Sequence, residues 1–162
     1  MSVAKKDPVF GGVSSEKSNQ GGYTFEKLKI GDMYKKSVFV TEGLLTLFGR
    51  ISGDWQPIHF DDAYAKETIF KGRVVHGMLV ESFFSGMIGM GFPGPGCILL
   101  EKHMVFKRPV RIGDVVELCV TVTELAEKES GGVVCLKATC EVGGKTALHG
   151  EIKLFVPKRK VP

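Results

Sequence analysis

One stretch, residues 74–91, constrains the fold of this chain more than any other. Its side chains would be apolar on nearly every side of a helix: Val74, Val75, Met78, Leu79, Val80, Phe83, Phe84, Met87, Ile88 and Met90. A helix without a polar face has to be enclosed by protein. His76, Glu81 and several glycines interrupt the stretch, whereas a membrane span needs about 20 predominantly apolar residues. We therefore predict a buried helix and no membrane span.

Downstream of residues 91–96, which end the helix with glycine and proline, the apolar residues recur at every second position in four segments. These residues are Ile98, Leu100, Met104 and Phe106; Val116, Leu118, Val120 and Val122; Val134, Leu136, Ala138, Cys140 and Val142; and Leu148, Ile152, Leu154 and Val156. Turn-forming residues at 109–114, 127–132 and 143–144 separate the segments. Four consecutive strands with one apolar face each predict an antiparallel meander. Only the 74–91 helix is apolar enough to be wrapped by that face, so we predict the α+β hot-dog fold, a curved antiparallel sheet around a long central helix.

Upstream of this helix the pattern is mixed. It predicts a strand over 33–40, a helix that opens at Thr41 as N-cap and ends near Gly49, and a short helical turn over 61–65 with an acidic first turn. With 162 residues, 43% of them hydrophobic, the chain fits one domain, which we place at 23–157. Residues 1–22 are polar and read as a flexible N-terminal arm, and residues 158–162 as a basic C-terminal tail.

The net charge of +4 comes from Lys and Arg residues that are scattered among acidic residues, which gives no indication of nucleic-acid binding. The excess suits an anionic small molecule or an acidic carrier protein, and it equally suits a merely soluble basic protein. The four cysteines form no Cys-x-x-Cys pair, so we expect reduced thiols with neither a disulfide nor a metal. The N-terminus has no apolar stretch for secretion. We expect an intracellular protein, in the cytoplasm or the mitochondrial matrix.

Asp54 and His59 lie five residues apart in a polar segment that Gly53 and Pro57 constrain. A carboxylate and an imidazole that converge across a rigid turn can bind one water molecule and exchange protons with it, which is paired general acid–base chemistry. The pattern alone leaves a second interpretation open, in which Asp54 caps the turn and His59 is a satisfied loop histidine.

Gly77 stands at the start of the 74–91 helix, where free backbone N–H groups favour negative charge. Its N–H could polarise a carbonyl oxygen, although a glycine that only allows close packing explains the residue as well. Ser85 follows two turns later, and its hydroxyl needs a partner such as Asp54. Ser82 competes for that role, and either serine could bond to its own helix. His76 we expect to be structural. No nucleophile elbow, phosphate loop or metal-binding motif is present, so we expect no cofactor and no metal.

Three motifs in the right order resemble the MaoC-like family of (R)-specific enoyl-thioester hydratases and 3-hydroxyacyl-thioester dehydratases. SGDWQPIH at 52–59 is similar to the family motif Ser/Thr-Gly-Asp-x-Asn-Pro-Leu/Ile-His. VVHGML at 74–79, followed by Ser85, resembles the start of the family's central helix, and FKRPVRIGD at 106–114 resembles the strand and turn after it. The resemblance covers roughly residues 23–157. Gln56 departs from it, because the family usually has Asn there.

The resemblance implies reversible addition of water to the C2=C3 bond of a trans-2-enoyl thioester of CoA or acyl carrier protein, in fatty acid metabolism. Asp54 and His59 would activate the water, the Gly77 N–H would polarise the thioester carbonyl, and Ser85 would orient the Asp54 side. Such proteins usually form homodimers, which also hides a strand edge. Lys107, Arg108 and Arg111 are candidate contacts for the anionic carrier.

Two alternatives remain open. A hot-dog thioesterase would hydrolyse the same thioester, and it would usually place its carboxylate on or near the central helix, where Glu81 is the candidate. A non-catalytic acyl-binding subunit of the same fold would be marked by loss of Asp54 or His59, and both are present.

Overall fold

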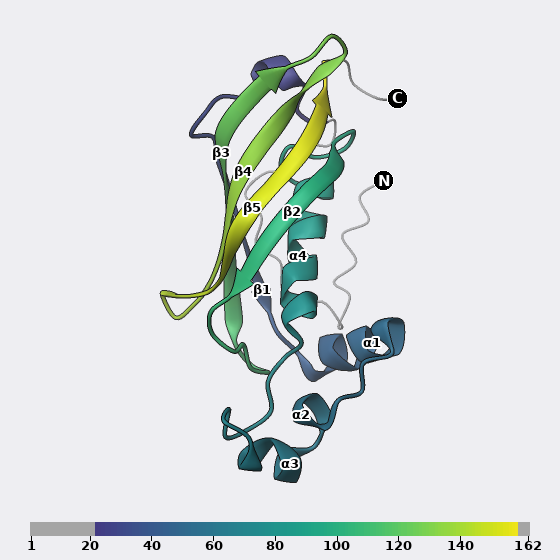
Figure 1. Ribbon diagram of the computed structural model, residues 1–162, viewed down its shortest axis with the longest axis vertical. Coiled ribbons are helices and arrows are strands. Elements are labelled where there is room, and N and C mark those ends of the chain that lie inside the picture. Colours follow the sequence, from purple (N-terminus) through teal and green to yellow (C-terminus); the bar gives the residue numbers. More distant parts are fainter. Residues whose placement is uncertain (1–21, 159–162) are drawn as a thin grey trace, which may run out of the picture.

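The computed structural model describes residues 22–158. The elements in chain order are a 3-10 turn, η1 (Phe25–Lys27), then β1 (Met33–Phe39), α1 (Glu42–Ser52), α2 (Pro57–Phe60), α3 (Asp62–Glu67), α4 (Gly77–Met90), β2 (Ile98–Phe106), β3 (Val115–Glu127), β4 (Gly131–Val142) and β5 (Lys145–Pro157). The five strands form one twisted antiparallel sheet, α4 runs along one face of it, and α1 to α3 lie together beyond one end (Figure 1). This is the predicted hot-dog fold. Among residues 22–158, no helix combines the length and the apolar character needed to cross a membrane.

The strand order is β1-β3-β4-β5-β2, which corrects the predicted four-strand meander. Only β3, β4 and β5 form a meander, whereas β2 pairs with β5 at the opposite edge from β1. Alternation of side chains shows which segments are strands and which face is apolar, but it does not select the neighbour. Residues 107–114 connect β2 to β3 across a sheet displacement of about 14 Å, three strand spacings, which eight extended residues can span.

The core lies between α4 and the sheet. The predicted inward residues of β3, β4 and β5 are buried, among them Val116, Leu118, Leu136 and Leu154. From α4, the side chains of Leu79, Val80, Phe84, Met87 and Ile88 are buried against them. Residues 22–158 leave the opposite side of α4 uncovered, with Met78 65% and Met90 71% exposed. The predicted full enclosure of this helix is therefore only half achieved within one chain.

Strand β2 differs most from its predicted pattern. Ile98 and Leu100 should face the core, yet Ile98, Leu99 and Leu100 are all more than half exposed. Two causes are visible: β2 is an edge strand, and its register with β5 shifts between Leu99 and Glu101. The edge strand therefore presents apolar side chains and unpaired backbone groups together.

The helices that precede α4 begin where the sequence predicts. The Thr41 side chain accepts a hydrogen bond from the backbone N–H of Leu44 at 3.2 Å and caps α1, which continues to Ser52 instead of ending near Gly49. Asp61 caps α3 in the same way. Apart from Gly22, the predicted N-terminal arm lies outside the described residues, as does the tail beyond Lys158, which pairs with Glu127.

Candidate active site

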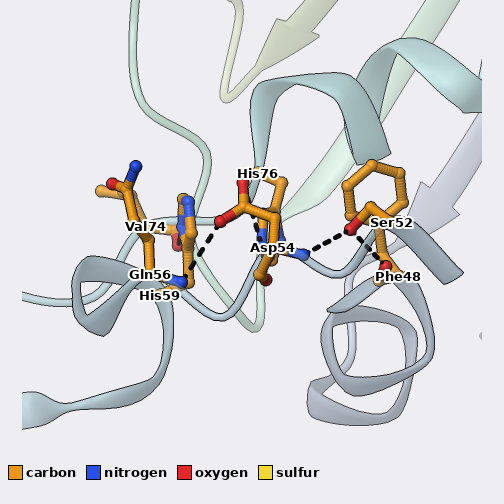
Figure 2. Close-up of polar contacts among 7 residues, drawn as sticks. All are labelled: Phe48, Ser52, Asp54, Gln56, His59, Val74 and His76. Atoms are coloured by element: carbon orange, nitrogen blue, oxygen red, sulfur yellow. Dashed lines mark hydrogen bonds and ion pairs between the residues drawn. The ribbon is translucent and has the colours of Figure 1, made fainter. Parts of the chain in front are cut away.

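The segment that carries Asp54 is held by its own polar groups. α1 ends on Gly53, whose positive φ of 76° turns the chain. The Ser52 hydroxyl donates to the backbone carbonyl of Phe48 at 2.7 Å and accepts from the N–H of Asp54 at 3.1 Å (Figure 2). Asp54 Oδ1 accepts from the N–H of Gln56 at 3.2 Å, so the carboxylate does cap the turn. Its second oxygen, Oδ2, accepts no hydrogen bond from a described residue and lies 3.8 Å from His76 Nε2.

His59 lies in the single turn of α2, which Pro57 starts, and not in an open loop as predicted. Its Nδ1 lies 2.8 Å from the backbone carbonyl oxygen of Val74, just before α4. Because a carbonyl oxygen can only accept, Nδ1 carries the proton in the neutral ring. The lone pair is then on Nε2, which is the arrangement that a general base requires.

Asp54, His59 and His76 converge. One carboxylate oxygen of Asp54 and one ring nitrogen of each histidine all lie within 4.8 Å of one another. A water molecule that makes hydrogen bonds of about 2.8 Å fits between two atoms up to about 5.6 Å apart. The predicted pair is therefore close enough to share one water. The Asp54 side chain remains 43% exposed, so water reaches it freely in this chain.

His76, which we expected to be structural, is buried directly beside the predicted pair. Its side chain is 3% exposed, and its Nε2–H donates to the backbone carbonyl of Asp54 at 3.0 Å. Its ring stacks on that of His59 with the centroids 3.7 Å apart. Burial lowers the pKa of His76, and the neighbouring His59 lowers it further, against opposing contributions from the Asp54 carbonyl and carboxylate. A neutral His76 places no positive charge against the His59 ring that stacks on it.

A cavity of about 620 Å³ opens at the N-terminus of α4. His59, Gln56 and Gly77 line it together with apolar residues from α4 and β2, including Met78 and Phe106, while Asp54 lies just outside its lining. The N–H of Gly77 belongs to the first turn of α4 and donates to none of the described residues. A Cβ at residue 77 would lie 2.7 Å from the Phe106 ring, so the packing interpretation of Gly77 also has support.

The other predicted site residues are separated. Lys107 and Arg108 line the cavity that contains His59. The Arg111 guanidinium instead donates to the carbonyls of Arg73 at 3.0 Å and Phe70 at 2.6 Å, and so holds the loop before α4.

Ser85 lies eight residues along α4 from Gly77, about 12 Å away along the helix axis. It lines a different cavity, and its hydroxyl makes no hydrogen bond to a described residue, so the expected contact with Asp54 is not made within this chain. Its competitor Ser82 donates to the carbonyl of Leu79 at 2.6 Å.

The same three residues, Asp54, His59 and His76, are also a possible metal-binding group by distance. Their hydrogen bonds disfavour that use, since His59 Nδ1 and His76 Nε2 both face backbone carbonyls and carry protons. A metal on His76 Nε2 would have to displace the hydrogen bond to Asp54. The arrangement instead leaves Nε2 of His59 and Oδ2 of Asp54 without a hydrogen bond to the described residues, which suits water, although Oδ2 lies 3.8 Å from His76 Nε2.

The residues of this site lie within a segment that matches a known protein family. Residues 27–143 match the family described as MaoC like domain. The chain belongs to the MaoC-like family. An "(R)-specific enoyl-CoA hydratase" of Rhodospirillum rubrum is 40% identical over 135 residues, which cover 83% of this chain and 92% of that protein. A "3-hydroxyacyl-[acyl-carrier-protein] dehydratase, mitochondrial" of Arabidopsis thaliana is 33% identical, covering 70% of this chain and 67% of that protein.

The fold agrees with solved structures of the family. The "R-Hydratase PhaJ1 from Pseudomonas aeruginosa in the unliganded form" superposes with a TM-score of 0.79 at 33% identity, over 86% of this MaoC-like chain and 89% of that one. The residues that match the family model, 27–143, include all three motifs on which the resemblance was based.

Proposed function

We propose that this MaoC-like protein catalyses the reversible hydration of trans-2-enoyl thioesters, and the reverse dehydration of (R)-3-hydroxyacyl thioesters. The observation that carries the proposal is the pairing of Asp54 with a His59 ring whose Nδ1–H is held by Val74 and whose Nε2 is therefore basic. Both groups lie beside a cavity that has a free backbone N–H at Gly77. The names of the relatives support the same reaction.

The mechanism follows from these positions. The thioester carbonyl oxygen accepts a hydrogen bond from the Gly77 N–H, where the helix N-terminus also stabilises the negative charge that develops on it. Water donates hydrogen bonds to Asp54 Oδ2 and His59 Nε2. As its oxygen adds to C3, one proton passes to this pair and is delivered to C2, so the net change is the addition of one water molecule. His76 and Val74 hold the pair in place.

The carrier of the acyl group is the CoA or acyl-carrier-protein arm, which is anionic in either form. Lys107 and Arg108 line the cavity next to His59 and supply positive charge along its wall. Arg111 is already engaged with backbone carbonyls, so we assign it to holding the loop before α4.

The protein acts as a homodimer in this proposal. The apolar edge of β2 and the open side of α4 lie next to each other, and both would be covered if β2 paired with its copy. Ser85 lies on that open side, so its predicted role in orienting Asp54 would require the partner subunit.

We further infer that the protein works inside the cell, in the cytoplasm or the mitochondrial matrix. The four cysteines are free thiols, which suits a reducing compartment.

The test is an assay of the purified protein with a short trans-2-enoyl-CoA, following loss of the conjugated-thioester absorbance and the chirality of the product. We expect the (R)-3-hydroxyacyl product, and a fall in kcat of about a hundredfold or more for Asp54→Asn and for His59→Gln. A wild-type protein without hydratase activity would overturn the proposal. So would Asp54→Asn and His59→Gln variants that are as active as the wild type.

The same assay distinguishes a hydratase from the alternative, a thioesterase. Glu81, its candidate carboxylate, forms an ion pair with Lys102 and lines the cavity of Ser85 instead of that of His59. Glu81→Gln should therefore leave the hydration rate unchanged. Release of free thiol that depends on Glu81 would favour the thioesterase.

A further inference from the structure

A second hollow, of about 560 Å³, adjoins the catalytic cavity, and its lining is basic. We call it the cationic groove; it is lined by Lys107, Arg108, Lys137, Thr139, Thr146 and His149, with no carboxylate among them. Lys137 and Thr139 alternate along β4 with the buried residues Leu136 and Ala138, so they lie on the sheet face that points away from α4. The groove thus lies on the outer face of the sheet, outside the core.

The cations of the groove have no partner of their own. Within residues 22–158, none of the side chains of Lys107, Arg108 and Lys137 forms an ion pair or a hydrogen bond. Glu151 stands opposite Lys137 in the strand register, yet it does not pair with it. Three unpaired cations around one hollow, with two threonine hydroxyls between them, favour an anion with several charges.

The groove is adjacent to the catalytic cavity, because Lys107 and Arg108 line both. A thioester bound at Gly77 and His59 therefore has its carrier arm directed along these two residues toward Lys137 and His149. We propose that the cationic groove binds the diphosphate and 3′-phosphate of coenzyme A while the acyl group occupies the catalytic cavity. This assignment rests on the proposed hydratase function and specifies its substrate as a CoA thioester.

The lining of the groove favours CoA over a carrier protein. CoA concentrates its phosphates at the end of one flexible arm, which suits a hollow lined by cations and hydroxyls. A carrier protein has one phosphate at the base of the arm, and its remaining charge is spread over folded surface that meets a broad face.

The experiment compares two thioesters of the same enoyl group, one of CoA and one of N-acetylcysteamine, which lacks all phosphates. For Lys137→Met we expect the KM for enoyl-CoA to rise about fivefold, and for Lys137→Glu about tenfold or more, with little change in kcat. The ratio of kcat/KM for the CoA thioester to that for the short thioester should fall by the same factors. Lys128→Met is the matched control, since it removes the same charge from the exposed turn before β4, remote from the groove; its KM should equal that of the wild type.

Adenosine 3′,5′-bisphosphate supplies a second readout that does not depend on catalysis. It should bind the wild type, more weakly at high salt, and should lose at least tenfold in affinity in Lys137→Glu. Equal KM values for enoyl-CoA in all variants would overturn the proposal even if hydration proceeds. The same holds if the wild type and Lys137→Glu bind adenosine 3′,5′-bisphosphate with equal affinity. A wild type that prefers enoyl-acyl carrier protein, with that preference lost in Lys137→Glu, would also overturn it in favour of carrier-protein docking. Failure to hydrate both the CoA thioester and the N-acetylcysteamine thioester would instead indicate that the hydratase function itself is wrong.

Discussion

His76 lies against both Asp54 and His59, donating through Nε2–H to the carbonyl of Asp54 and stacking its ring on that of His59. It thus joins the end of the segment at 52–57 to α2 and to the start of α4. Its Nδ1 is buried without a hydrogen-bond partner, which is tolerable only for a neutral ring. We regard it as a positioning residue that acts on the catalytic pair through geometry.

A pH prediction follows from the lowered pKa of His76. In the unfolded chain its pKa is the ordinary 6.5, whereas in the folded chain burial holds the value below that. The stabilisation is therefore fully present above pH 6.5 and is lost as the pH falls through the folded value, because the unfolded state takes up a proton that the folded state resists. Urea unfolding of the wild type at pH 7.5 and pH 5.5 should show this loss.

The variant His76→Phe keeps a ring in the stack but cannot titrate. Its free energy of unfolding should fall less between the two pH values than that of the wild type. The two proteins differ in no other titratable residue. Identical pH dependence in the two proteins would contradict the assignment.

Metal removal tests the same cluster. Since His59 Nδ1 and His76 Nε2 carry protons in their hydrogen bonds to Val74 and Asp54, the reaction should not need an ion there. Dialysis against a strong chelator should leave kcat/KM for enoyl-CoA unchanged. A loss of activity that zinc restores would show that the three residues work as metal ligands.

At the scale of elements, α4 is packed by one side only. Met87 is 1% exposed against the sheet, whereas Met90, one turn later, is 71% exposed. Met87→Ala should lower the free energy of unfolding by about 2–4 kcal/mol, because it leaves a cavity in the core. Met90→Ala is the matched control and should change it by less than about 0.5 kcal/mol.

Denaturant titration of both variants under the same conditions checks this contrast. Equal losses in the free energy of unfolding for Met87→Ala and Met90→Ala would contradict the one-sided packing of α4.

At the scale of the whole molecule, the edge of β2 decides the assembly. Ile98, Leu99 and Leu100 are exposed on a strand whose outer backbone groups have no partner strand among residues 22–158. Leu100→Lys should shift the protein from dimer to monomer, because a charged side chain disfavours pairing of strand edges. Light scattering on a sizing column measures this directly.

Ile69→Lys is the control for that experiment. Ile69 is 88% exposed, but it lies in the loop after α3, away from β2, so its substitution should leave the dimer intact. A wild-type monomer at micromolar concentration would contradict the dimer proposal.

Much of the fold could be predicted from local sequence because local patterns reflect local physics. The alternation in β3, β4 and β5 identified the buried face, and Thr41 and Asp61 marked the starts of α1 and α3. The prediction was wrong for strand β2. Its residues alternate as if one face were buried, but β2 lies at the edge of the sheet and is exposed on both faces over most of its length.

The sequence by itself determined the MaoC-like family and the hot-dog class, because motif spacing and periodicity are properties of neighbours along the chain. It also predicted that Asp54 and His59 converge, while the same pattern allowed a capped turn with no shared task. Only the tertiary structure decided which nitrogen of His59 is free, that Arg111 holds a loop, that Ser85 lies apart from Asp54 in one chain, and that Lys137 and His149 join Lys107 in one groove. Each of these depends on contacts between residues 15 to 41 positions apart or on the pairing of strands. Such contacts are set by the packing of the sheet and α4, and no local pattern encodes them.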